Sequence, residues 1–167
     1  LIKCIKFGAP IIPRTLIVEL SKFIGRLAFV FDNRGRLTGM ANAKCAIDSN
    51  EITSYKTRQI IIRSYEFFSR SAIDLFWGRN LNKNNYSDFI QFEFEDKDAH
   101  ERAAKQGAIW ITPHYGNFEW LSLAMGFRGT PLTVIAQDFR NPLLTNIFKT
   151  ARGHSGNEII SSKKAVI

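Results

Sequence analysis

The sequence is poor in the residues that bind metals or form disulfides. Its 167 residues include only two cysteines and three histidines. The cysteines, Cys4 and Cys45, form no C-x-x-C pair, and the histidines are scattered. A zinc site or a disulfide framework is therefore a poor explanation of the fold. We expect no metal site and no bound cofactor.

A long apolar run is also missing. No stretch of about 18 uncharged apolar residues is present, so no clear transmembrane helix is predicted. Apolar residues still make up 45% of the chain, which predicts a globular domain with a core. The chain starts at Leu1 rather than Met and stops on an apolar residue. We expect it to be a fragment of a longer protein.

The formal charge of the chain is +8. A basic balance favours an anionic partner, which is a nucleic acid, a lipid headgroup or an acidic carrier protein. The aromatic and basic motif typical of an RNA-binding sheet is absent. A non-catalytic basic module that binds membranes or nucleic acid therefore ranks low, and no nucleic-acid partner is expected.

Residues 1–36 form a basic, amphipathic region. They carry seven Lys or Arg and two Asp or Glu, a local charge of +5. Their apolar side chains recur at helical spacing, as Leu16, Leu20, Phe23, Ile24 and Leu27. Such a helix can lie on an anionic membrane surface, or it can pack on its own domain as most amphipathic helices do. We treat residues 1–36 as a membrane-proximal helical region and 37–167 as the N-terminal part of the main domain.

The pattern changes along the second region. A polar, glycine-bearing break is predicted at 31–39 and a long helix from about Ser49 to Phe76. Further on, four short apolar runs alternate with helical patterns, and these strands are predicted at 89–94, 108–112, 132–136 and 157–161. The helices between them are predicted at 96–107, 117–127 and 141–153. The expected fold class is α/β, a mostly parallel sheet with helices on both faces, preceded by a helical region.

The stretch HYGNFE, residues 114–119, falls where the strand 108–112 ends and a helix begins. On one ideal helix, His114 and Glu119 would lie roughly 140° apart and could not meet. If His114 instead lies in the turn and Glu119 in the first helical turn, both can face one crevice. Gly116 allows the tight bend, and Asn117 can cap the helix.

This combination of residues suits proton transfer. Histidine can deprotonate a hydroxyl near neutral pH, and a carboxylate can orient its ring. The helix N-terminus offers free N–H groups to an anion or oxyanion. No G-x-S-x-G elbow is present, which favours a substrate hydroxyl as the nucleophile. By itself, however, H-x4-E occurs often by chance.

The longer stretch around this motif resembles the bacterial lipid A biosynthesis acyltransferases, the lauroyl/myristoyl acyltransferase family. The resemblance covers roughly residues 89–165. It is carried by HYGNFE, by Asn141-Pro142-Leu143, and by Arg152 with Gly153. The family belongs to the wider glycerolipid acyltransferases that share H-x4-[DE].

The resemblance implies an enzyme that moves a fatty acyl chain from acyl carrier protein, or from coenzyme A, to a hydroxyl of a lipid A precursor. It implies His114 as general base and Glu119 as its partner. Oxyanion or phosphate contacts are then expected from Arg152, Arg140 and Asn117, and acceptor or donor contacts from Lys163 and Lys164. The implied location is the cytoplasmic face of the bacterial inner membrane, either peripheral or through a single N-terminal anchor.

Two positions depart from the family pattern. Gln137 stands where an arginine is usual near the strand end, and Arg140 is a candidate to replace it. Phe118 stands where tryptophan is usual, a mild change of packing. The acceptor cannot be read from a base and its carboxylate, so another glycolipid or a lysophospholipid remains an alternative acceptor.

Overall fold

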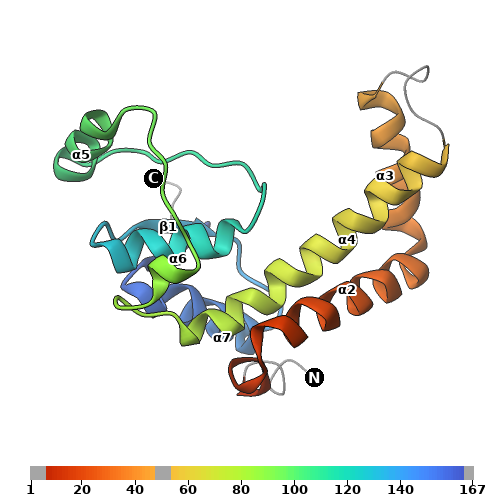
Figure 1. The fold of residues 1–167 in the computed structure, drawn as a ribbon, viewed down its shortest axis with the longest axis horizontal. Coiled ribbons are helices and arrows are strands. Elements are labelled where there is room, and N and C mark those ends of the chain that lie inside the picture. The colour runs from red at the N-terminus through yellow and green to blue at the C-terminus, as the bar shows by residue number, and fades with distance from the viewer. Residues whose placement is uncertain (1–6, 48–53, 164–167) are drawn as a thin grey trace. The chain divides into compact units, whose positions relative to one another are not determined.

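A computed structural model describes residues 7–47 and 54–163 of the chain. The chain divides into two compact units, Leu1–Asp74 and Leu75–Ile167, and the division falls inside the last turn of the helix α4. Figure 1 labels the main elements. The proposed division at residue 36 concerns a membrane-proximal role and stays a prediction.

The first unit is built from helices. They are α2 (Arg14–Phe31), α3 (Asn33–Ala46) and most of α4 (Ser54–Trp77), preceded by a 3-10 turn η1 (Ala9–Ile11). The long helix predicted from residue 49 is confirmed from Ser54 onward, whereas 49–53 lie outside the described residues. The break predicted at 31–39 is present but is confined to Asp32, which separates α2 from α3. Asp32 caps α3 by accepting from the N–H of Gly35, and the helix then runs through Gly35 and Gly39.

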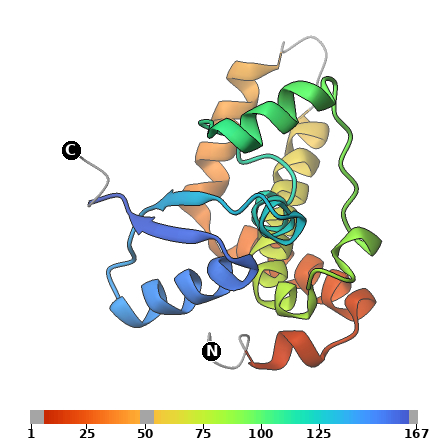
Figure 2. The same cartoon turned by 90° about the vertical axis from the view of Figure 1, so that its left-hand side faces the viewer.

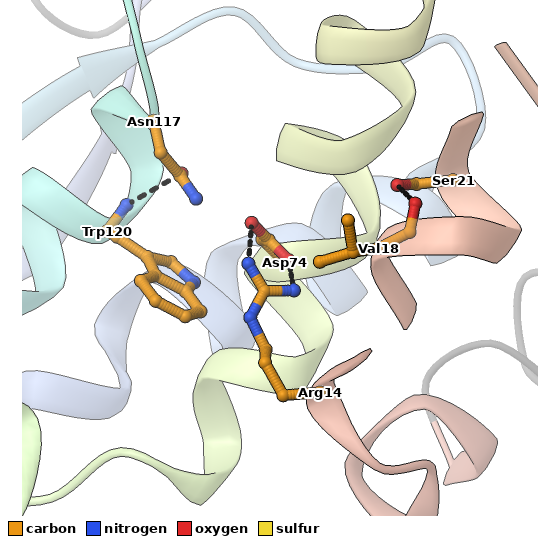
Figure 3. Close-up of polar contacts among 6 residues, drawn as sticks. All are labelled: Arg14, Val18, Ser21, Asp74, Asn117 and Trp120. Carbon is orange, nitrogen blue, oxygen red and sulfur yellow. Dashed lines mark hydrogen bonds and ion pairs between the residues drawn. The ribbon is translucent and has the colours of Figure 1, made fainter. Parts of the chain in front are cut away.

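Helices α2 and α4 lie side by side (Figure 1) and approach closely at Gly25. A Cβ added there would lie 2.4 Å from Cα of Glu66. The start of α2 is fixed by Arg14, whose guanidinium donates 2.6 and 2.9 Å hydrogen bonds to the fully buried carboxylate of Asp74 (Figure 3). The missing side chain of Gly25 therefore allows the two helix backbones to approach this closely.

The second unit combines helices with a small sheet. Its helices are α5 (Lys97–Gln106), α6 (Phe118–Arg128) and α7 (Pro142–Arg152), with 3-10 turns η2 (Gly78–Asn80), η3 (Tyr86–Asp88) and η4 (Gly153–Ser155). Strands β1 (Thr133–Ala136) and β2 (Glu158–Ser161) pair in parallel (Figure 2). In their register Thr133 lies opposite Glu158. These five helices and strands confirm the predicted elements at 96–107, 117–127, 132–136, 141–153 and 157–161.

Two other predicted strands do not form. Residues 89–94 and 108–112 have no ladder partner in the described chain. Instead Phe92 and Phe94 stack on each other, and Ile109 and Ile111 are each 92% exposed. A strand needs a neighbour for its N–H and C=O groups. The described fold is mostly helical with one parallel pair, which is compatible with the α/β class. The larger, mostly parallel sheet with helices on both faces is not seen in the described residues.

An aromatic core holds the second unit together. Trp77 stacks on Trp120 at 5.7 Å, and Phe89 meets both rings edge-on. Buried Asn157 ties this core to the sheet, because it donates to the carbonyl of Ser122 in α6 and accepts from the N–H of Leu132, just before β1. These contacts fix α6, and with it the start of the HYGNFE helix, against β1 and β2.

Candidate active site

The turn before α6 has the bend and the cap that the sequence predicts. Gly116 has a φ of 63°, a left-handed conformation that favours glycine. The side-chain oxygen of Asn117 accepts a 3.2 Å hydrogen bond from the N–H of Trp120, which caps the helix (Figure 3). The residues of HYGNFE are thus divided between an exposed turn and a buried helical turn.

His114 lies in the exposed part of this turn. Its ring meets the Phe118 ring at 4.6 Å, nearly edge-on. Among the described residues, no hydrogen bond or ion pair is made by the imidazole. Both ring nitrogens are therefore accessible to a substrate hydroxyl.

Glu119 lies in the first turn of α6 and is only 7% exposed. Its carboxylate is held by Arg152, whose Nε lies 3.0 Å from Oε2 and whose Nη2 lies 2.6 Å from Oε1. No hydrogen bond joins Glu119 to His114 in the part of the chain that the structure describes. The pairing of the two residues during catalysis stays a prediction.

The structure separates the other predicted site residues. Arg152 bonds Glu119, whereas Arg140 is exposed in the loop before α7 and makes no hydrogen bond or ion pair with a described residue. Asn117 caps α6. Lys163 is exposed at the end of β2, and Lys164 lies outside the described residues.

A pocket of about 330 Å³ opens at the carboxyl ends of β1 and β2. Ligands of parallel α/β sheets collect at this edge. Three cationic residues line it, Lys149, Arg152 and Lys163, against one carboxylate, that of Asp138. Phe139 and Phe148, which pack together at 4.7 Å, give it an apolar wall. The pocket is thus suited to an anionic group attached to an apolar chain.

One contact at this edge was not expected from the sequence. The hydroxyl of Ser161 donates to the carboxylate of Asp138, and the backbone N–H of Lys163 donates to the same hydroxyl at 3.2 Å. These two hydrogen bonds link the loop after β1 to the end of β2. The only sequence signal for it is that both polar residues directly follow predicted strands, which is too general to pair them.

A histidine in the turn before a helix, with a buried carboxylate in the helix's first turn, is the arrangement expected of an H-x4-[DE] acyltransferase. Comparison with known families agrees with this class. The chain belongs to the bacterial lipid A biosynthesis acyltransferases, whose family model matches residues 4–167. Membership implies an acyltransferase of lipid A biosynthesis that acts on a lipid acceptor. No curated protein and no solved structure shows a significant match to the chain.

Proposed function

We propose that the protein transfers a fatty acyl chain from acyl carrier protein, or from acyl-coenzyme A, to a hydroxyl of a lipid A precursor. His114 is the general base and Glu119 its partner. Family membership supports the reaction class. The observation that supports the residues is the exposed, unpaired imidazole of His114 beside the helix turn that buries Glu119.

The proposed reaction is a direct transfer. His114 takes the proton of the acceptor hydroxyl as the oxygen attacks the thioester carbonyl carbon. The tetrahedral oxyanion forms near the first N–H groups of α6, which lack intrahelical partners by the geometry of any helix. The C–S bond then breaks, and the imidazolium returns its proton to the thiolate that leaves. Glu119 stabilises the imidazolium in between.

We place the enzyme at the cytoplasmic face of the inner membrane, in contact with an anionic lipid surface. Helix α2 supports this location. It turns Ile17, Ser21 and Gly25 inward, roughly 140° around the helix from its large apolar side chains. Apart from Ile17 and Phe29, which are buried, those large side chains remain exposed, and they are Leu16, Leu20, Phe23, Ile24, Leu27, Val30 and Phe31. This exposed apolar face is proposed to lie on the membrane. Within the described residues no helix is long and apolar enough to span a bilayer.

Mass spectrometry of lipid A tests the proposal. The complete gene is expressed in a bacterium that lacks its late lipid A acyltransferases, as wild type and as His114→Ala. We expect the mass of one acyl chain to be gained with the wild type and lost with the variant, since a general base contributes about 10²–10⁴-fold. His154→Gln is the matched control, because His154 is also exposed but its ring contacts the carbonyl of Leu81.

The control variant should retain the gain in mass at equal protein level. A gain that persists in His114→Ala would remove this histidine from the mechanism. No gain with folded wild-type protein would move the activity to another acceptor lipid.

A further inference from the structure

Arg152 contributes both to the contact with Glu119 and to the cationic pocket. Its guanidinium holds the buried carboxylate of Glu119, and the same side chain lines the cationic pocket at the ends of β1 and β2. It is partly exposed, at 23% of its side-chain surface, whereas Glu119 is at 9%. The arginine can therefore be reached from the pocket, while the carboxylate behind it is closed off.

We propose that Arg152 is a substrate-operated switch: a phosphate group entering the pocket draws the guanidinium away from Glu119 and frees that carboxylate to pair with His114. The inference rests on the proposed function and adds the ligand class and the regulation of the same site. The ligand is a phosphomonoester attached to an apolar chain. While Arg152 holds Glu119, this carboxylate is not bonded to His114 in the part of the chain that the structure describes.

The chemistry of the two partners makes such an exchange feasible. Guanidinium binds carboxylate and phosphate with the same two-pronged geometry, so one can replace the other. A phosphate carries more charge than a carboxylate, and Lys149 and Lys163 line the same pocket. A ligand shifts such an equilibrium only by its differential affinity for the two states, and here that difference comes from these cations.

The resulting arrangement has a catalytic consequence. While Arg152 holds Glu119, the charge of that carboxylate is neutralised, and His114 has no hydrogen-bond or ion-pair partner among the described residues. Water that reaches a bound thioester then meets His114 without the support of the Glu119 carboxylate, so it is activated poorly. Occupation of the pocket assembles the pair, so binding of the phosphorylated acceptor favours transfer over hydrolysis of the donor.

Binding of hexyl phosphate to the full-length protein tests the switch, without requiring any acyl transfer. If Arg152 must leave Glu119 to reach the ligand, Glu119→Gln should tighten binding by about tenfold, because the competing carboxylate is gone. The tightening should disappear when Arg152 is also replaced by Gln. Glu101→Gln, on the exposed part of α5, removes one negative charge elsewhere and should change nothing.

These variants separate the switch from its alternatives. If Glu119 instead orients the Arg152 guanidinium toward the ligand, Glu119→Gln should weaken the binding of hexyl phosphate. That result would overturn the proposal. Equal tightening with and without Arg152 would show mere charge repulsion and would overturn it as well. Hexyl phosphate should bind about tenfold more tightly than inorganic phosphate because Phe139 and Phe148 can cover its chain. Equal affinities would overturn the assignment to a lipid phosphate.

A second readout uses the wild-type protein and guards against a variant that fails to fold. Diethyl pyrocarbonate labels exposed histidines, and mass spectrometry of peptides resolves His114 from His154. Hexyl phosphate should slow labelling of His114 and leave His154 unchanged, because Glu119 engages the ring of His114. In Glu119→Gln this protection should be lost even though the ligand binds more tightly; protection that persists would mean simple shielding by the ligand and would overturn the switch.

The two proposals can fail separately. Loss of the switch with lipid A acylation intact would leave the proposed function in place. If lipid A is not acylated but the binding and labelling results are as expected, the switch stands. Phosphate then controls the pairing of Glu119 with His114 in an enzyme that acts on another acceptor.

Discussion

Arg152, the last residue of α7, holds Glu119, the second residue of α6, through hydrogen bonds from both Nε and Nη2. The two residues are 33 positions apart in the chain. Their contact joins the end of one helix to the beginning of another, so it fixes the first turn of the HYGNFE helix as well as neutralising a buried charge. Stability and catalysis should therefore both respond when the contact is broken.

Replacing Arg152 with Ala should lower the free energy of unfolding by about 2–3 kcal/mol. Removing one partner of a buried ion pair costs about 3–5 kcal/mol, and the partial exposure of Arg152 reduces this. Urea denaturation measures the loss. Arg140→Ala is the matched control, because Arg140 is exposed and makes no hydrogen bond or ion pair with a described residue. This variant should stay within about 0.5 kcal/mol of wild type. Equal losses in the two variants would contradict a stabilising role of the Glu119 contact.

The sequence predicted the local parts of this site but not its pairings. Asn117 as a cap and Gly116 as a bend follow from the preferences of single residues, and the structure has both. The contact of Arg152 with Glu119 depends on how α6 and α7 pack, and no local pattern encodes that distance. The same reason explains why Asp138 and Ser161 could not be paired beforehand.

For the fold, helices were predicted better than strands. A helix satisfies its own backbone, so its periodicity suffices to predict it. The residues of AIWIT, 108–112, have the apolar character of a buried strand, but a strand also needs a partner, and the described sheet contains only β1 and β2. The glycines at 35 and 39 suggested a break, yet capping by Asp32 outweighed them and α3 runs through both.

Gly25→Ala should destabilise the first unit by about 2–3 kcal/mol. The added Cβ would lie 2.4 Å from Cα of Glu66, which is backbone and cannot turn aside, and overpacking of this kind typically costs about 1–3 kcal/mol. Gly39→Ala in α3 is the control, since its Cβ would meet side-chain atoms of Ile61 and no backbone, with Cδ1 at 3.3 Å and Cγ2 at 3.4 Å. That variant should gain up to about 1 kcal/mol from helix propensity. Thermal unfolding compares the two, and a neutral Gly25→Ala would contradict the close helix contact.

The Asp32 and Tyr65 pair predicts a defined dependence of stability on pH. The N–H of Gly35, and then the hydroxyl of Tyr65, hold the pKa of Asp32 below its ordinary value of 3.8. A lowered pKa in the folded state means that the stabilisation is present above pH 3.8 and is lost as the pH falls below it. Burial, followed by the bond to Asp32, raises the pKa of Tyr65 above 10.0, so its contribution is present below pH 10.0 and is lost as the pH rises further.

Two variants separate the loss of stability at acid pH from the loss at alkaline pH. In Asp32→Asn, the difference in unfolding free energy from wild type should shrink between about pH 5 and about pH 2, because wild type loses what the variant never had. Tyr65→Phe should instead change the profile above pH 10.0. Denaturant unfolding at each pH provides the curves. A difference for Asp32→Asn that is constant across the acid range would show that the carboxylate is not stabilised in the fold.

The exposed face of α2 predicts binding to anionic membranes. Phe23 is 60% exposed and Leu27 is 40% exposed, on the side of the helix away from Gly25. Replacing both with Gln keeps the helix but removes apolar area, and full burial of such side chains is worth about 1.5–3 kcal/mol each. The double variant should therefore bind vesicles containing about a third of anionic lipid at least tenfold more weakly. Phe68→Gln is the control, because Phe68 is an aromatic side chain on α4 that is 70% exposed. Binding measured by co-sedimentation should weaken with salt, because the cations around α2 contribute about 1 kcal/mol each near the lipid surface.

One outcome would contradict this prediction. If the Phe23 and Leu27 variant sediments with vesicles as wild type does while the protein stays monomeric, α2 does not bind the bilayer. Its apolar face must then be covered by protein.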